Sequence, residues 1–140
     1  MGRGKREMED ASTVLLVDDE PVFLESMSKV LAKRGFRIQT VESGEEALTA
    51  IEAGGIDVVV LDQKMPGYDG LTTLEHIRRR FPLLQVIFLS GHADVGTAVE
   101  AMERGAVDYL IKPASVDKLC ERIRASLARR QVQEAPDRGS

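Results

Sequence analysis

Short apolar runs alternate with longer amphipathic segments along most of the chain. The short runs are rich in β-branched residues, and several are apolar at nearly every position instead of at every second one. Strands that are apolar on both faces are typical of a parallel sheet covered by helices on both sides. The pattern therefore predicts an α/β fold with five strands, expected at Thr13–Val17, Phe36–Val41, Ile56–Leu61, Leu84–Leu89 and Val107–Ile111.

Five helices are predicted after these strands, because apolar residues recur there at every third or fourth position. Local chemistry marks where the helices begin and end. Pro21 can open the first helix, and Ser43 with Glu46 forms a capping-box pattern at the second. Glycines stand where helices are expected to end, at Gly35, Gly54 and Gly105.

The two ends of the chain lack this pattern. Residues 1–12 mix both charge signs without an apolar period, which predicts a disordered leader. From about Arg129 the apolar stripe is lost, so residues 129–140 are expected to form a frayed tail or a linker. Residues 13–128 are predicted to form a single domain, which suits a chain of 140 residues.

The composition is that of an ordinary globular protein, with 43% hydrophobic and 30% charged residues. A formal net charge of −4 provides no general attraction to nucleic acid or anionic lipid, so direct contact of this domain with either is not expected. The lone Cys120 cannot form an internal disulfide, and neither end carries an apolar run long enough for a signal peptide or a membrane span. A cytoplasmic location is expected.

Polar residues directly follow the predicted strands, at the edge where open parallel sheets bind ligands. Carboxylates brought together at this edge would repel one another unless a cation compensates them. Oxygen ligands suit Mg²⁺, which binds one or two carboxylates together with water and a phosphate. The sequence therefore predicts a Mg²⁺ site among the residues that follow the strands, which are Asp18, Asp19, Asp62, Ser90 and Lys112.

Phosphoryl chemistry is the reaction that best suits these residues. An aspartate can attack phosphorus and form an aspartyl phosphate when a metal and a lysine neutralise the transferring oxygens. Asp62 is the candidate phosphoacceptor, and Lys112 is the cation that can pair with the anion. Ser90 can donate its hydroxyl to a phosphoryl oxygen.

Four motifs carry a resemblance to a known family. In chain order they are VDDE at 17–20, LDQKMPGYDG at 61–70, SGH at 90–92 and AVDYLIKP at 106–113. With these motifs, the chain from about Thr13 to Leu127 resembles the receiver domain of a two-component response regulator. The resemblance implies a flavodoxin-like sheet of order 2-1-3-4-5.

It also implies a mechanism. A phosphoryl group passes from the phosphohistidine of a histidine kinase, or from a phosphotransfer protein, to Asp62. Mg²⁺ is held by Asp19, Asp62 and the backbone carbonyl of Lys64, and Asp18 acts largely through water. The domain is then no enzyme in the ordinary sense, although it assists its own phosphotransfer and autodephosphorylation.

The same resemblance implies a switch. Ser90 moves toward the phosphoryl group, Tyr109 turns inward, and the surface formed by the fourth helix, fifth strand and fifth helix changes. That surface is expected to control an output domain or a protein partner, or to form a homodimer on phosphorylation.

Three other functions suit parts of the pattern. An aspartyl-phosphate hydrolase usually has a second aspartate two residues after its nucleophile, where this chain has Lys64. A flavin or nucleotide site would need Gly, Ser or Thr donors after the first strand, where acidic residues repel phosphate. An interaction module that works without phosphorylation remains an alternative.

Lys64 places a second cation at the mouth of the predicted site. We expect it to change the lifetime of the phosphoaspartate, because its ammonium group competes for water or for the phosphoryl oxygens. The measurement compares dephosphorylation of the domain with that of its Lys64→Ala form. Identical decay of the two proteins would contradict the prediction.

Overall fold

The computed structural model describes residues 11–91 and 95–139, and strands and helices alternate throughout this range. Residues 1–10 of the predicted leader and His92 lie outside the described residues. The elements are β1 (Thr13–Val17), α2 (Pro21–Lys33), β2 (Arg37–Val41), α3 (Gly44–Glu52), β3 (Val58–Leu61), α4 (Gly70–Arg80), β4 (Gln85–Ser90), α5 (Val95–Glu103), β5 (Asp108–Ile111) and α6 (Val116–Gly139).

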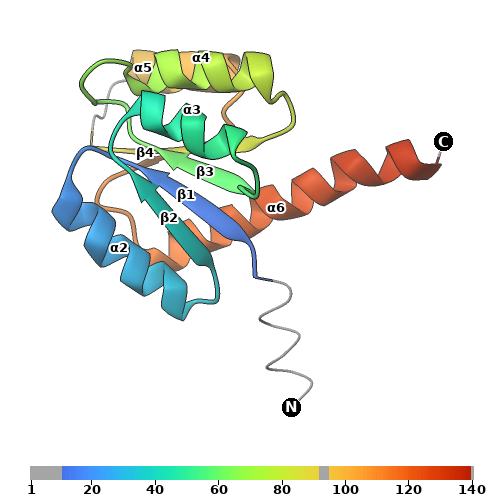
Figure 1. Ribbon diagram of the computed structural model, residues 1–140, viewed down its shortest axis with the longest axis horizontal. Coiled ribbons are helices and arrows are strands. Elements are labelled where there is room, and N and C mark those ends of the chain that lie inside the picture. Colours follow the sequence, from blue (N-terminus) through green and yellow to red (C-terminus); the bar gives the residue numbers. More distant parts are fainter. Residues whose placement is uncertain (1–10, 92–94, 140) are drawn as a thin grey trace.

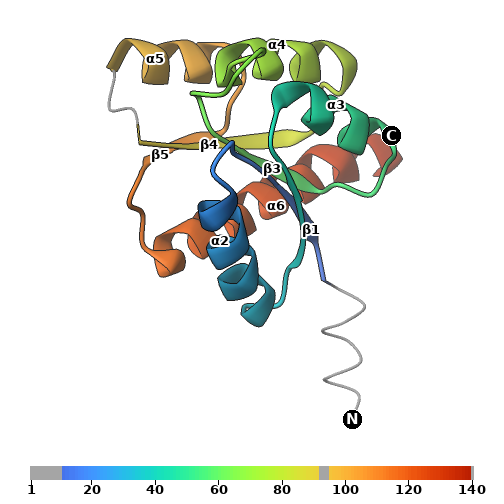
Figure 2. The ribbon, with the colours of Figure 1, turned by 60° about the vertical axis from the view of Figure 1, so that its left-hand side comes forward.

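The strands form one parallel sheet in the order β2-β1-β3-β4-β5. This confirms the α/β prediction and the order implied by the resemblance, and the predicted strand limits agree within two residues. Helices α3, α4 and α5 cover one face of the sheet, and α2 and α6 cover the other (Figures 1 and 2).

Both faces of the sheet are apolar, because side chains alternate between two cores. On β1, Leu15 and Val17 pack with residues of α3, α4 and α5, whereas Val14 and Leu16 pack with residues of α2 and α6. All six residues of β4 are buried. The continuous apolar runs in the sequence thus reflect burial on both sides of each central strand.

The predicted helix ends are found with one difference. The Ser43 side chain accepts a hydrogen bond from the backbone of Glu46 at 3.1 Å, as the capping-box pattern predicts. The Glu46 carboxylate, however, accepts from the N–H of Glu42 at 2.8 Å, one residue before the N-cap. Gly35 and Gly105 follow α2 and α5 with φ of 99° and 108°, a conformation that favours glycine.

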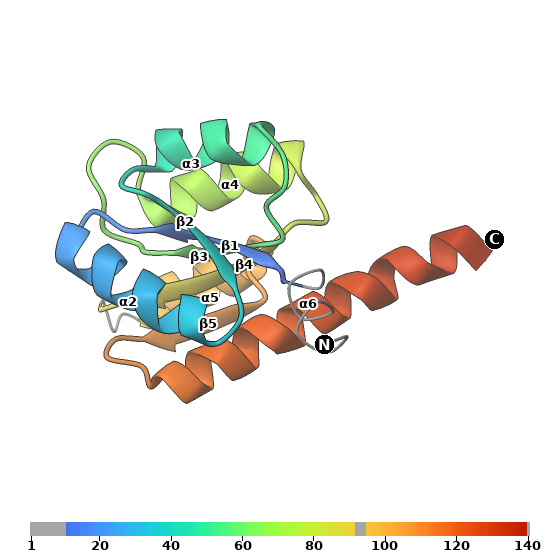
Figure 3. The same ribbon diagram turned by 60° about the horizontal axis from the view of Figure 1, so that its bottom comes forward.

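Helix α6 continues to Gly139, past the point near Arg129 where a frayed tail was expected (Figure 3). Residues such as Gln, Glu, Ala and Arg favour helix without needing an apolar face, so loss of the stripe did not end the helix. The division into leader, domain and tail or linker stays a prediction.

Arg78 of α4 connects its helix to the loops that precede β4 and β5, at the amino ends of these strands. Its guanidinium donates to the carbonyls of Pro82 and Leu84 at 2.8 and 2.9 Å and to that of Gly105 at 3.0 Å. A Cβ at Gly105 would lie 2.6 Å from Arg78 Nε, so the turn passes directly over this side chain. Burial lowers the pKa of Arg78 from its usual value.

We expect Arg78→Met to lower the free energy of unfolding by about 2 kcal/mol, because partly buried carbonyls lose their donors. Urea unfolding measures the change. The matched control is Arg79→Met on the exposed side of the same helix, expected to change stability by less than about 0.5 kcal/mol. Equal effects of the two substitutions would contradict the view that the hydrogen bonds of Arg78 stabilise the fold.

Candidate functional site

The polar residues predicted to gather do so at the carboxyl edge of the sheet. The strand ladder continues into them: the N–H of Asp62 donates to Val17 O at 3.0 Å, and the N–H of Lys112 donates to Ser90 O at 2.9 Å. The N–H of Asp18 donates to the carbonyl at the end of β2 at 3.2 Å. These side chains therefore project from ordered strand ends.

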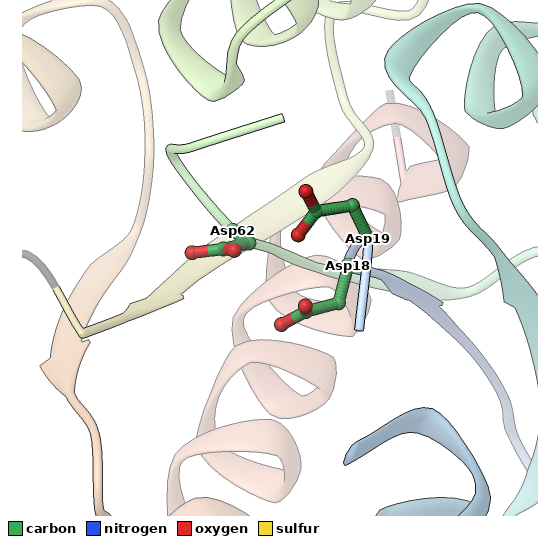
Figure 4. Close-up of side chains that lie close together, drawn as sticks. All are labelled: Asp18, Asp19 and Asp62. Carbon is green, nitrogen blue, oxygen red and sulfur yellow. The ribbon is translucent and has the colours of Figure 1, made fainter. Parts of the chain in front are cut away.

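Asp18, Asp19 and Asp62 form an acidic trio (Figure 4). One carboxylate oxygen from each lies within 4.8 Å of those of the other two. Asp18 and Asp62 are buried, whereas Asp19 is exposed. Such a group of hard oxygen ligands can hold a metal ion.

Lys112 is the cation that faces this trio. Its Nζ lies 2.5 Å from Asp18 Oδ2 and 4.0 Å from Asp62 Oδ2. A third carboxylate, that of the exposed Glu20, lies at 3.4 Å. The ammonium also lies 4.1 Å from the centre of the Phe23 ring, a cation–π contact. Lys112 thus compensates part of the negative charge without a metal.

The electrostatics of the site are dominated by burial and crowding. Burial raises the pKa of Asp62, and the Asp18 carboxylate raises it further, while Lys112 and a hydrogen bond with Ser90 act in the opposite direction. Burial alone would lower the pKa of Lys112, but its hydrogen bond with Asp18 and the nearby carboxylates raise it above its usual value. Asp62 carries its charge at a cost in this environment.

A pocket of about 940 Å³ opens over these residues. Thr97 of α5 lines this pocket. Five residues assigned from the sequence line it as well, and they are Asp19, Asp62, Lys64, Ser90 and Lys112. Asp18, the third member of the trio, is buried and is not among the lining residues. The predicted phosphoacceptor, metal-binding and lysine residues thus meet in one place, whereas Tyr109 is not among the residues that line the pocket.

Tyr109 lies on β5 and is partly buried. Its ring stacks on that of Phe88 in the adjacent strand, with centroids 5.7 Å apart and planes 11° from parallel. Phe88 is two residues before Ser90 on β4. The aromatic pair therefore lies next to the strand end that carries Ser90.

Six pocket residues were given no individual role from the sequence, and they are Glu20, Gln63, Met65, Asp69, Gly91 and Thr97. Thr97 is only 9% exposed, and nothing in the spacing of α5 distinguishes it from other inward-facing positions. Gln63 adjoins Asp62, but a glutamine after a strand carries no signal of its own. Glu20 belongs to the acidic run after β1, which was the available signal.

The fold and the pocket define a class, a doubly wound α/β domain with an acidic, lysine-bearing site at the carboxyl edge of its sheet. The family model of the response regulator receiver domain matches residues 14–124. The chain therefore belongs to the receiver domain family of two-component response regulators. Phosphoryl acceptance is the standard function of this family of signalling domains.

Curated relatives agree with this assignment. The DNA-binding transcriptional regulator NtrC of Salmonella typhimurium is 37% identical over 123 residues, which are 88% of this chain and 26% of NtrC. The transcriptional activator protein IrlR of Burkholderia pseudomallei is 38% identical over 122 residues, 87% of this chain and 53% of IrlR. The chain thus spans about a quarter of the first relative's length and about half of the second's.

Solved structures show the same fold. The match to NtrX of Brucella abortus has a TM-score of 0.86 and 31% identity, and covers 93% of this chain and 30% of that one. The match to a response regulator receiver domain protein of Clostridium thermocellum has a TM-score of 0.83 and 33% identity, and covers 87% and 98%. In the described part of this chain, each helix is too short or too polar to cross a membrane.

We expect Asp62→Asn to raise the melting temperature at neutral pH without divalent cations. Because the pKa of Asp62 is raised in the folded state, the wild type loses stability as pH rises from the ordinary value of 3.8 to the raised one. The asparagine form lacks this loss, so its advantage should vanish in acid and be complete above the raised pKa.

Calorimetry in the presence of a chelator measures this difference. The control is Glu103→Gln on the exposed side of α5, expected to show no such pH-dependent advantage. An Asp62→Asn form that melts at or below the wild-type temperature at neutral pH would contradict the prediction.

Proposed function

We propose that Asp62 is the phosphoacceptor of this receiver domain, and that its donor is the phosphohistidine of a histidine kinase or of a phosphotransfer protein. The observation that carries the proposal is the environment of Asp62. It is buried at the end of the central strand β3, lines the pocket, and has the ammonium of Lys112 4.0 Å from its carboxylate. A partner of this kind implies a cytoplasmic location.

A divalent cation fits the donor set. Three carboxylates within 4.8 Å of one another raise the local negative charge beyond what one lysine compensates, and burial with this crowding raises the pKa of Asp62. We assign Mg²⁺ to Asp19, Asp62 and the backbone carbonyl of Lys64, with Asp18 acting largely through water. When bound, Mg²⁺ neutralises charge on the transferring phosphoryl oxygens.

The transfer is an exchange of one bond to phosphorus for another. A carboxylate oxygen of Asp62 attacks phosphorus, an O–P bond forms as the P–N bond of the phosphohistidine breaks, and the electron pair returns to the imidazole nitrogen. The Lys112 ammonium pairs with a phosphoryl oxygen, and the buried Ser90 hydroxyl donates to another. The domain assists this step and its own later dephosphorylation, and it has no other substrate in this scheme.

Ser90 and Tyr109 form the proposed switch. When Ser90 turns toward the phosphoryl group, the adjoining pair of Phe88 and Tyr109 can follow, because the rings are stacked across two neighbouring strands. This would alter the surface of α5, β5 and α6. Exposed apolar side chains on that surface are Val95, Val99, Met102 and Ile111. We propose that it controls an output domain or partner, or forms a homodimer.

Phosphorylation can be tested by intact mass after incubation with Mg²⁺ and a small phosphodonor. We expect a labile adduct of one phosphate, absent from the Asp62→Asn form and absent when a chelator is added. A folded wild type that gains no adduct would contradict the proposal and favour an interaction module that works without phosphorylation. An adduct that persists on the Asp62→Asn form would assign the phosphate to another residue.

The surface of α5, β5 and α6 can be tested by sedimentation with and without phosphodonor. We expect phosphorylation to raise the sedimentation coefficient or the affinity for a partner, and Val99→Glu to remove the increase because it places a charge among apolar side chains. The matched control is Leu83→Glu. Leu83 is 48% exposed and lies on the loop before β4. An unchanged profile and unchanged partner affinity after phosphorylation would count against this surface.

A further inference from the structure

Gln63 directly follows Asp62, and its side chain turns back onto the beginning of α4. Its Oε1 accepts a hydrogen bond from the N–H of Leu71 at 2.9 Å, and its Nε2 donates to Asp69 Oδ2 at 3.3 Å. Its backbone carbonyl accepts from the N–H of Gly70 at 2.8 Å. One residue beside the proposed phosphoacceptor thus makes three hydrogen bonds to the start of a helix.

These bonds act as a second cap on α4. The first N–H groups of a helix have no partner within the helix and need acceptors from outside it. Asp69 is the N-cap and accepts from the N–H of Thr72 at 2.8 Å through Oδ1, which leaves Oδ2 for Gln63. Gln63 supplies the acceptor for the N–H of Leu71, and Asp69 supplies the acceptor for the N–H of Thr72. These two acceptors lie at opposite ends of the loop that precedes α4.

The helix also begins in direct contact with the peptide that joins Asp62 and Gln63. A Cβ at Gly70 would lie 2.4 Å from the carbonyl oxygen of Asp62 and 2.8 Å from the Cα of Gln63. The loop between Gln63 and Gly70 is therefore closed at its base. The N–H of Gln63 in turn donates to Asp62 Oδ1 at 2.8 Å, which orients that carboxylate.

We propose that Gln63 is a positioning residue for the divalent cation: its side chain ties α4 to the loop that carries Lys64, and so holds the Lys64 carbonyl and the Asp62 carboxylate in the arrangement that binds metal. This inference rests on the proposed function, which names both groups as ligands. Gln63 and Lys64 both line the pocket. Mg²⁺ requires near-ideal octahedral geometry at short distances, so freedom in one ligand-bearing loop weakens binding.

The test measures Mg²⁺ affinity by isothermal titration calorimetry for the wild type and for Gln63→Met, which keeps the side-chain length and removes both hydrogen-bonding groups. We expect the dissociation constant to rise on the order of tenfold, the effect typical of losing a group that orients a metal ligand. The rate of phosphorylation by a small phosphodonor should fall at low Mg²⁺ and recover at saturating Mg²⁺.

Ser43→Ala is the matched control for a simple loss of helix capping. Ser43 caps α3 by accepting from the N–H of Glu46 at 3.1 Å, on a helix whose residues do not line the pocket. It should lower the melting temperature as Gln63→Met does and leave the Mg²⁺ dissociation constant unchanged. If Gln63→Met does not fold, Gln63→Asn takes its place with the same expectation, because its amide is one methylene too short to keep these contacts.

An unchanged Mg²⁺ dissociation constant in a folded Gln63 variant would overturn the inference, as would an equal weakening in the Ser43 control or a wild type that binds no Mg²⁺. A weakened dissociation constant confined to the Gln63 variant would support it. If that result appears in a domain that gains no phosphate, the inference stands and the proposed phosphoacceptor function fails.

Discussion

The crowding of negative charge at the carboxyl edge of the sheet is the constraint on which the site depends. Asp18 and Asp62 are both buried there, and burial together with the neighbouring carboxylate raises the pKa of Asp62. Lys112 compensates Asp18 at 2.5 Å and reaches Asp62 at 4.0 Å, so the compensation is uneven. The uncompensated negative charge of these carboxylates therefore favours binding of a cation in the pocket.

The fold tolerates such a site because its core lies elsewhere. The central strands bury apolar side chains on both faces, and the backbone ladder runs unbroken to the residues that bear the carboxylates. At the amino ends of the strands, Arg78 donates hydrogen bonds to backbone carbonyls of the loops before β4 and β5. Groups held at the ends of regular strands keep their spacing better than groups on free loops.

The pocket also adjoins the surface through which a signal would leave. Ser90 ends β4, Thr97 brings the first turn of α5 into the lining, and the ring of Tyr109 stacks on Phe88 one strand away. The exposed apolar residues Val95, Val99, Met102 and Ile111 lie on the same helix as Thr97 or the same strand as Tyr109. Ser90, Thr97 and Tyr109 thus lie on the elements that form this surface, so the proposed phosphorylation of Asp62 has a short route to it.

The order of elements, the parallel sheet and five of the eleven pocket residues could be predicted from the sequence alone. Strand and helix periods are local, and the carboxyl ends of parallel strands must share one edge, so Asp18, Asp62 and Lys112 could be placed together from spacing alone. Three contacts became evident only in the folded structure: Lys112 pairs mainly with Asp18, Gln63 caps α4, and Arg78 joins distant loops. Those contacts depend on how elements pack, which no local period encodes.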